Sequence, residues 1–244
     1  MTDVRLSLVI PAFNEQAILP RLLRTVDVAR DRYTRGRDAI EVIVADNCST
    51  DDTAAIAERM GCRVVRVETR NIGAVRNGGA REARGELLCF VDADGQVHPD
   101  VFNAADEALS SGRYSVGATG VRMERMSLGI ACTWLVLVPM VVLTGIDTGL
   151  VFCRRSDFEA VGGYDEQRPA GEDVCLHLSL MRLGKPRRQG AVRLPHVKGI
   201  SSTRKFDEHG DWHYFRILRD VPRLMLDPTH RSDWMMKYWY PDRR

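Results

Sequence analysis

The sequence predicts an α/β protein with a mostly parallel, Rossmann-like sheet and helices on both of its faces. Short β-branched runs alternate with helical patterns through the first 91 residues, and repeated βα units build such a sheet. The 244 residues suffice for one large domain, whereas two independent cores are not expected. Apolar residues make up 44% of the chain and charged residues 28%, which indicates a globular protein and not a disordered chain.

Four strands and three helices are expected in alternation before residue 92. Apolar runs bounded by turn residues indicate the strands, and apolar positions at helical spacing indicate the helices. We predict strands at residues 6–10, 40–45, 63–67 and 87–91, and helices at 18–30, at 51–60 and up to about residue 84. Beyond residue 114 the pattern is less regular, with a strand-like run at 149–153 and a helix at 172–183.

Charge and cysteine content narrow the class of protein. The net charge of +2, from 35 basic and 33 acidic residues, argues against a basic nucleic-acid-binding protein. The six cysteines include no C-x-x-C pair, and most lie in apolar runs where a reduced thiol behaves as a small hydrophobic group. No charged segment followed by an apolar stretch opens the chain, so we expect a cytoplasmic and not a secreted protein.

Polar residues follow the predicted strands where each strand ends. Ligands of open α/β sheets bind beyond the carboxyl ends of the strands, so these residues are the first candidates for a site. Asn14 and Glu15 follow the first strand, and Asp46 ends the second. Asp92 and Asp94 follow the fourth strand.

The triplet Asp92-Ala93-Asp94 is the candidate metal site. Alternate residues of an extended chain point the same way, so both carboxylates can face one ligand. Two hard oxygen ligands suit Mg²⁺ or Mn²⁺, above all when a diphosphate supplies further oxygens. The alternative is a turn in which each Asp bonds its own backbone.

Asp46 is expected to contact the ribose or base of a nucleotide, or to cap the helix that follows it. A dinucleotide site is not expected, because no G-x-G-x-x-G follows the first strand; the segment Pro11-Ala12-Phe13-Asn14-Glu15 stands there instead. A Rossmann-type oxidoreductase is therefore a weak alternative.

Two further segments carry charged residues next to a predicted helix start. Arg76 and Asn77 lie among glycines in the segment 71–79, which suits either phosphate contact or close packing of the helix on the sheet. Glu172 and Asp173 open the helix predicted at 172–183, where carboxylates serve either chemistry or the helix dipole.

The segment 168–205 carries nine Lys or Arg residues against two acidic ones, a local excess that includes Arg204 and Lys205. It suggests an anionic ligand, and a solvated basic face is the alternative. His209 and His213 are four residues apart, as metal ligands on one helix would be, or they belong to an amphipathic surface helix. Whether either of them, or His196, touches a metal is left open.

The order of these motifs resembles that of glycosyltransferase family 2, the nucleotide-sugar enzymes with a GT-A fold. The resemblance spans about residues 6–183. It rests on seven motifs, namely Pro11-Ala12-Phe13-Asn14-Glu15, Asp46 with Ser49-Thr50-Asp51, Arg76-Asn77-x-Gly79, Phe90-Val91-Asp92-Ala93-Asp94, the run 149–155, Gly162-Gly163-Tyr164-Asp165 and Glu172-Asp173. Asn47-Cys48 departs from the family's usual Asp-Gly after the second-strand aspartate.

The resemblance implies a donor site built on the first four strands. Pro11, Glu15 and Asp46 are expected around the nucleoside, Asp92 at the ribose or metal, and Asp94 on a Mn²⁺ or Mg²⁺ ion held by the diphosphate. The full set expected to contact the donor is Pro11, Ala12, Asn14, Glu15, Asp46, Arg76, Asn77, Asp92, Ala93, Arg204 and Lys205. A UDP-sugar is the favoured donor, on resemblance alone.

The resemblance also implies inversion at the anomeric carbon with Asp173 as the base and Glu172 as its neighbour in the catalytic pair. No Q-x-x-R-W signature of processive polysaccharide synthases is present, so transfer of a single sugar is expected. The alternative is a nucleotide-sugar-binding protein without activity, which would need no base. We expect a GT-A domain at 1–205, with a nucleotide-sugar half at 1–114 and an acceptor half at 115–205, and an extension at 206–244.

One uncharged segment, residues 127–146, approaches the apolar content of a membrane span. A single crossing would place Asp94 and Asp173 on opposite sides of the bilayer, so the segment is expected to be a buried core or acceptor-site helix, or an interfacial helix. The extension is rich in aromatic and basic residues, which suits a membrane surface or a dimer interface. The resulting hypothesis is a peripheral enzyme of the cytoplasmic membrane face with a lipid-linked acceptor.

Overall fold

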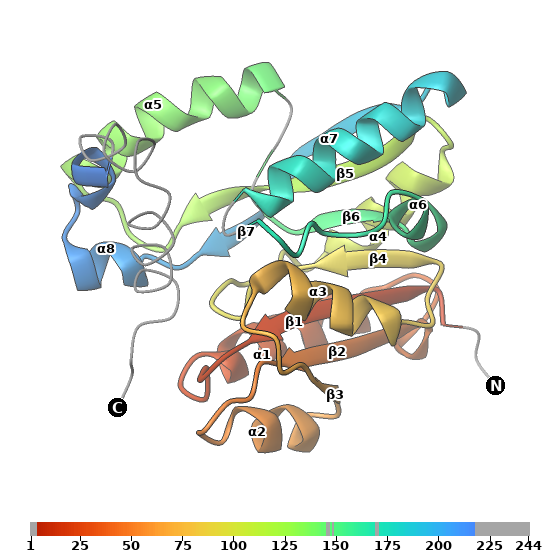
Figure 1. Cartoon of the computed structure of the whole chain (residues 1–244), viewed down its shortest axis with the longest axis horizontal. Helices are drawn as coiled ribbons and strands as arrows, with labels where there is room; N and C mark the ends of the chain where they lie inside the picture. The colour runs from red at the N-terminus through yellow and green to blue at the C-terminus, as the bar shows by residue number, and fades with distance from the viewer. Residues whose placement is uncertain (1–3, 145–146, 148, 169–170, 218–244) are drawn as a thin grey trace.

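The computed structural model describes residues 4–144, 147, 149–168 and 171–217. These residues form a seven-stranded sheet of order β3-β2-β1-β4-β6-β5-β7 (Figure 1). The strands are β1 (Leu6–Ala12), β2 (Ile40–Asp46), β3 (Arg63–Arg66), β4 (Leu87–Phe90), β5 (Tyr114–Met123), β6 (Val151–Arg154) and β7 (Gly190–Ser201). Strand β6 is antiparallel to both of its neighbours and every other pairing is parallel, so the predicted mostly parallel sheet is confirmed.

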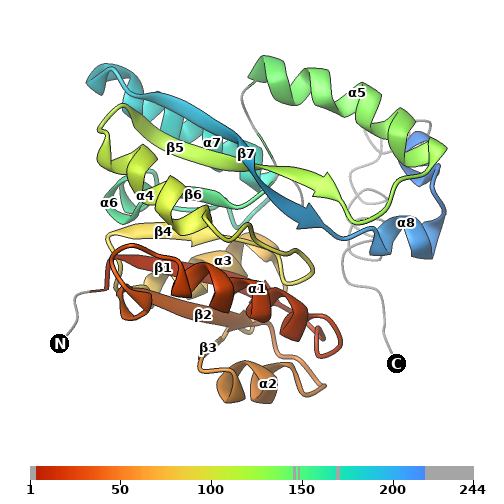
Figure 2. The ribbon, with the colours of Figure 1, turned by 180° about the vertical axis from the view of Figure 1, so that it is seen from behind.

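Helices cover both faces of the sheet, as predicted. Helices α3, α6 and α7 lie on one face, and α1 and α4 lie on the other (Figures 1 and 2). The helices are α1 (Leu19–Asp31), α2 (Thr53–Arg59), α3 (Ile72–Arg81), α4 (Val101–Ser110), α5 (Leu128–Thr144), α6 (Arg155–Ala160), α7 (Glu172–Gly184) and α8 (Arg204–His209), with short 3-10 turns at Arg37–Ala39 and Lys185–Arg187.

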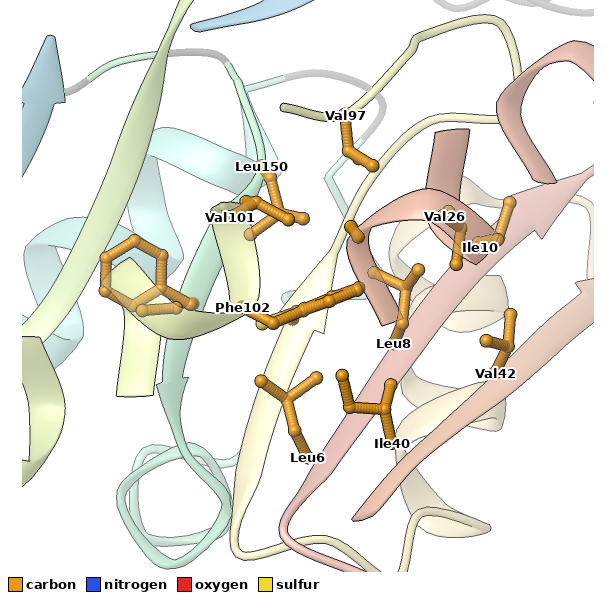
Figure 3. Close-up of a cluster of buried hydrophobic side chains, with 14 of the residues drawn as sticks. Leu6, Leu8, Ile10, Val26, Ile40, Val42, Val97, Val101, Phe102 and Leu150 are labelled. Atoms are coloured by element: carbon orange, nitrogen blue, oxygen red, sulfur yellow. The ribbon is translucent and has the colours of Figure 1, made fainter. Parts of the chain in front are cut away.

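The two-residue period of β1 divides its side chains between two apolar cores. Leu6, Leu8 and Ile10 pack with residues of α1 and α4, among them Phe102, which lies against the strand in Figure 3. Val9 points to the opposite face and joins a second cluster under α3 and α7. The sheet is thus buried on both sides, which explains why its strands are apolar throughout and do not alternate with polar residues.

The four strands and three helices predicted before residue 92 are confirmed, with ends that differ by a few residues. The helix α4 and the strands β5 and β7 were not predicted. Glycines at 117 and 120 interrupt the apolar pattern of β5, and β7 carries Arg193, Pro195 and Lys198 within its span. These strands form because neighbouring strands pair with them, and tertiary context overrides their weak local propensity.

Helix α5 occupies most of the apolar segment 127–146 and projects from one end of the sheet (Figure 1). Ile130 is buried, but Leu128, Leu135 and Val136 are 74%, 77% and 54% exposed. Of the alternatives for this segment, the buried core helix is therefore wrong, because the helix extends beyond the sheet instead of packing across it. The acceptor-site and interfacial alternatives stay predictions. No helix in the described part of the chain has the length and apolar content that crossing a membrane requires.

Candidate active site

The loops that follow β1 and β2 are tied together at the carboxyl edge of the sheet. The backbone N–H of Asn14 donates to Ser49 Oγ at 3.0 Å, and Asn14 Oδ1 accepts from the Thr50 N–H at 2.8 Å. The Glu15 N–H donates to Thr53 Oγ1 at 2.8 Å. Asn14 adopts a left-handed conformation with φ of 54°, which an Asn side chain tolerates. The two loops therefore form one rigid floor.

Asp46 ends β2 within this floor and is buried, with its carboxylate accepting the Ser49 N–H at 3.3 Å. The next residue, Asn47, is buried and clamps the end of β3. Its amide nitrogen donates to the carbonyls of Val67 at 2.6 Å and Thr69 at 3.0 Å. The departure from the family pattern at Asn47 therefore has a structural role in this chain.

The predicted metal site lies beside a cationic residue of α8. The Arg204 guanidinium bonds both carboxylate oxygens of Glu15, at 2.7 and 3.1 Å, and its Nη2 lies 3.5 Å from Asp94 Oδ2. Burial and the nearby charge of Asp92 raise the pKa of Asp94 to about 6, although Arg204 opposes them. Burial lowers the pKa of Lys205 to about 8. Four groups predicted to hold the metal and the diphosphate thus lie together.

Asp92 and Asp94 fit a divalent cation by their chemistry. The charge of Asp92 raises the proton affinity of the partly buried Asp94, and a divalent cation would relieve that repulsion. Among the described residues, no group of three or more His, Cys, Asp or Glu side chains is arranged to hold a metal. The two carboxylates would therefore need further oxygens from a ligand, which is what a diphosphate supplies.

The carboxylates of α7 are joined to this loop by Arg76 of α3. Its Nη2 donates to Asp92 Oδ1, and its Nη1 donates to Glu172 Oε1 and to Asp173 Oδ1, each at 2.7 Å. Burial works against the positive charge of Arg76, but the three carboxylates hold its pKa well above the ordinary value. Three residues that are 16, 96 and 97 positions away from Arg76 in the sequence thus meet at its guanidinium.

The two members of the predicted catalytic pair differ in exposure. The Glu172 side chain is 9% exposed, whereas that of Asp173 is 41% exposed and lines the cleft. Burial raises the pKa of Asp173 to about 6; the Arg76 charge lowers it, and Glu172 and Asp92 raise it. Of the pair, Asp173 is the carboxylate that a ligand in the cleft can reach.

The cleft holds about 680 Å³ of empty space that is open to solvent. Asp92 and Asp94 line it together with Asp173, Arg76 and Tyr164. The wall also includes residues to which the sequence analysis gave no site role, namely Gln96 to His98, Thr119, Val121 and Gly199 to Ser201, and it includes Gly149 to Val151 of the motif 149–155. Tyr164 belongs to the motif Gly162-Gly163-Tyr164-Asp165, to which the sequence analysis assigned no role in the site.

Several predicted site residues lie behind the cleft and not on its wall. Pro11, Ala12 and Ala93 are buried. Asn77 is also buried, and its amide exchanges hydrogen bonds with the backbone N–H and C=O of Tyr164, both at 2.9 Å. Asn77 therefore fixes the loop that carries Tyr164, and its predicted contact with the donor stays a prediction.

Helix α3 lies close to the sheet because of its glycines. A Cβ on Gly79 would lie 2.5 Å from Val9 Cγ1, and one on Gly78 would lie 2.5 Å from Val67 Cγ2. Of the two roles expected for these glycines, close helix packing is the one that the contacts support. This packing places Arg76 beneath the cleft.

The histidine pair lies in an aromatic cluster. The His213 ring is 4.8 Å from the Phe206 ring and 4.1 Å from the Tyr214 ring, between centroids, and burial lowers its pKa. His209 and His196 are exposed. These contacts fit the amphipathic alternative of the sequence analysis.

Comparison with known proteins gives consistent results. The model of Glycosyl transferase family 2 matches residues 7–127. An undecaprenyl-phosphate 4-deoxy-4-formamido-L-arabinose transferase of Pseudomonas paraeruginosa is 39% identical over 119 residues, which cover 46% of this chain and 34% of the relative. The match thus spans about a third of that relative's length.

Solved structures show the same fold at low identity. The crystal structure of Staphylococcus aureus TarS 1-349 in complex with UDP-GlcNAc has a TM-score of 0.62 at 19% identity, covering 81% of this chain and 58% of that one. The Pyrobaculum calidifontis mannosyltransferase PcManGT, in complex with GDP-Man and Mn²⁺, has a TM-score of 0.63 at 22% identity, covering 81% and 56%. These structures show that the fold is GT-A-like. The matched family model, the sequence relatives and the motifs at the carboxyl edge of the sheet show that the chain belongs to glycosyltransferase family 2.

Proposed function

We propose that this chain transfers one sugar from a nucleoside diphosphate to an acceptor hydroxyl or phosphate, with inversion at the anomeric carbon. The observation that carries the proposal is that Asp92, Asp94 and Asp173 line one cleft, although α7 lies about 80 residues after the loop that carries the other two. A donor-binding protein without activity would need the first two carboxylates but not the third.

The donor is proposed to lie over the floor made by the β1 and β2 loops. Glu15 and Asp46 would face the nucleoside, and Arg204 and Lys205 would bind the diphosphate. Arg204 now pairs with Glu15, and a diphosphate offers the guanidinium the same bidentate oxygen geometry. We expect Arg204 to exchange carboxylate for phosphate oxygens when the donor binds.

Asp94, with Asp92, would hold Mn²⁺ or Mg²⁺. When bound, the cation stabilises the negative charge that develops on the leaving diphosphate. The two structures compared above contain different nucleotides, UDP-GlcNAc in one and GDP-Man with Mn²⁺ in the other, so they do not distinguish uridine from guanosine donors.

Asp173 would act as the base. When the acceptor is a hydroxyl, its oxygen forms a bond to the anomeric carbon while its proton passes to the Asp173 carboxylate. The bond from that carbon to the diphosphate oxygen breaks, and the nucleoside diphosphate leaves with the electron pair. A positioned base contributes roughly 10²- to 10⁴-fold to the rate.

A pair of isosteric variants tests this assignment. Asp173→Asn should keep Mn²⁺-dependent binding of UDP or GDP and lose roughly 10²-fold or more in donor turnover, measured as nucleotide release. Glu172→Gln is the matched control, because Glu172 is next to Asp173 in the sequence and bonds the same Arg76 guanidinium, but its side chain is buried. If Glu172→Gln loses turnover while Asp173→Asn keeps it, the base is Glu172. If no UDP- or GDP-sugar is turned over by the unmodified chain, the protein only binds nucleotide sugars.

The nucleotide is the next property to measure. We propose a UDP-sugar as the donor, from the family resemblance. Thermal unfolding with Mn²⁺ and each of UDP and GDP should show a larger stabilisation by UDP, since a ligand that binds only the folded state raises the melting temperature. Stabilisation by GDP alone would contradict this choice.

We also propose a lipid-linked acceptor presented at a membrane surface, which a cytoplasmic enzyme would meet at the inner face of the membrane. The Pseudomonas relatives are named as undecaprenyl-phosphate transferases. In this chain, Leu128, Leu135 and Val136 of α5 are exposed together with Met126 and Trp212, a grouping that suits the interface of a bilayer. The predicted contribution of Trp234 and Tyr238 to Tyr240, at a membrane or a dimer interface, lies outside the described residues.

Flotation with anionic liposomes tests the membrane contact. The double substitution Leu135→Ser with Val136→Ser should weaken flotation without lowering the free energy of unfolding, because both side chains are exposed. Val28→Ser on α1 is the control, since Val28 is 50% exposed and lies on another face. Unchanged flotation of the double variant would remove α5 from the membrane contact.

A further inference from the structure

Arg76 has an unusual environment for a cation beside a proposed phosphate site. Its side chain is 6% exposed, and both terminal nitrogens donate to carboxylates. Its guanidinium carbon also lies 5.2 Å from the centroid of the Tyr164 ring. The Tyr164 ring therefore covers one face of the Arg76 guanidinium, and carboxylates occupy both of its terminal nitrogens.

The three carboxylates come from two separate parts of the cleft wall. Asp92 belongs to the loop after β4, which carries the proposed metal site, and Asp173 and Glu172 belong to the first turn of α7. One planar guanidinium spans the two parts, with 2.7 Å bonds to each. A rigid fork with fixed donor directions holds two partners at a set separation, which a single ammonium group does not.

We propose that Arg76 is a positioning residue for the transfer reaction. It fixes the Asp173 carboxylate relative to Asp92, so that the base faces the anomeric carbon of a donor bound at the metal loop, and it does not itself contact the phosphates. The proposal rests on the proposed function, because it requires Asp173 to be the base. It changes the role that the sequence indicated for Arg76, from a donor ligand to a residue that acts through two carboxylates.

Arg76→Lys tests the proposal, because lysine keeps the charge and loses the fork. We expect kcat for donor turnover to fall roughly 10²-fold. The Kd for UDP in the presence of Mn²⁺ should change by less than about threefold, because no phosphate contact is lost. Arg81→Lys is the matched control: it lies on the same helix, pairs with Glu166 at 2.9 Å and is 68% exposed, and it should leave both quantities unchanged.

The competing roles give different results. A phosphate ligand would show a Kd for UDP raised tenfold or more by Arg76→Lys. A purely structural ion pair would show a lower melting temperature with kcat unchanged for the fraction that remains folded. Either result overturns the proposal.

A double-mutant cycle with Asp173→Asn identifies the residue through which Arg76 acts. In that background Arg76→Lys should reduce the residual turnover by less than about threefold, because the carboxylate it positions is already disabled. Independent, multiplicative losses would overturn the proposal. If Arg76→Lys fails to fold, Arg76→Gln combined with Glu172→Gln removes one buried charge of each sign, and the same loss of kcat is expected.

Turnover by the unmodified chain and by Asp173→Asn distinguishes an error in the proposed function from an error in the role of Arg76. If the unmodified chain turns over no donor, or Asp173→Asn keeps full turnover, the proposed function or its base is wrong, and the positioning role is wrong with it. If both behave as proposed and Arg76→Lys equals the unmodified chain, only the role of Arg76 is wrong.

Discussion

Asp173 combines partial exposure with a raised proton affinity. Because burial raises its pKa to about 6 and a base must be deprotonated, turnover should rise with pH through about 6 and level off above pH 7. The pH profile of kcat at saturating donor and Mn²⁺ measures this. A profile that is flat between pH 5 and 8 would contradict the assignment of Asp173 as the base.

The raised pKa of Asp173 also predicts that stability decreases with pH, whereas turnover increases. The pKa of Asp173 in the folded protein lies above the value of about 3.9 for an unfolded Asp, so the folded state binds more protons between about pH 4 and 6. The free energy of unfolding therefore decreases as pH rises through that window. Asp173→Asn removes the cost of ionising this carboxyl group in the folded state. It should therefore stabilise the protein at pH 7.5 but not at pH 4, as measured by urea unfolding at both pH values.

Asn47 stabilises the loop after β3 through the hydrogen bonds that its side-chain amide donates. Its amide nitrogen donates to two carbonyls, so Asn47→Asp removes both donors and places a carboxylate against carbonyl oxygens. We expect a loss of about 1–3 kcal/mol in the free energy of unfolding. Asn71→Asp is the control, since Asn71 caps α3 through its Oδ1, which Asp replaces, and the one donor bond that it loses, to the Arg168 carbonyl, is exposed. Equal effects of the two substitutions would contradict the clamp.

At the scale of elements, the turn that ends α6 holds the wall of the cleft. Gly163 has φ of 75°, and a Cβ there would lie 2.6 Å from Asn77 Oδ1, the atom that accepts the Tyr164 N–H. Gly163→Ala should therefore cost about 2–4 kcal/mol in the free energy of unfolding, from backbone strain and the broken clamp.

Gly162→Ala separates these two contributions. Gly162 has φ of 81° but open space around the added Cβ, so only the backbone strain of about 1 kcal/mol applies. Urea unfolding of both variants gives the comparison. If the two losses are equal, the contact between Gly163 and Asn77 does not stabilise the turn.

At the scale of the whole molecule, the predicted nucleotide half and acceptor half share one apolar core. Leu150 and Phe152 of the second half belong to the same apolar cluster as Leu6 and Leu8 of the first. The division at residue 114 stays a prediction about binding roles. For folding, we expect the sheet and the helices on it to unfold as one unit.

Helix α5 is expected to unfold at a lower urea concentration than the sheet and the helices packed on it. Its exposed apolar residues contribute little to the core, and all four tryptophans of the chain lie at residue 134 or later. Tryptophan fluorescence should therefore change at a lower urea concentration than the circular dichroism at 222 nm, which reports the other helices. Trp134→Phe identifies the contribution of α5. Coincident transitions would show that α5 is as stable as the sheet.

The sequence by itself determined the first half of the sheet and the identity of the charged groups. Apolar runs of β1, β2 and β4 predict buried strands because such runs are stable only inside a sheet, and the polar residues after them mark its carboxyl edge. The tertiary structure alone decided the pairing of β5 and β7, whose own residues have weak strand propensity, and the meeting of Asp92, Glu172 and Asp173 at Arg76. The reason is physical: local patterns fix the period and burial of an element, whereas contacts between residues 16 to 97 positions apart depend on how the elements pack in space.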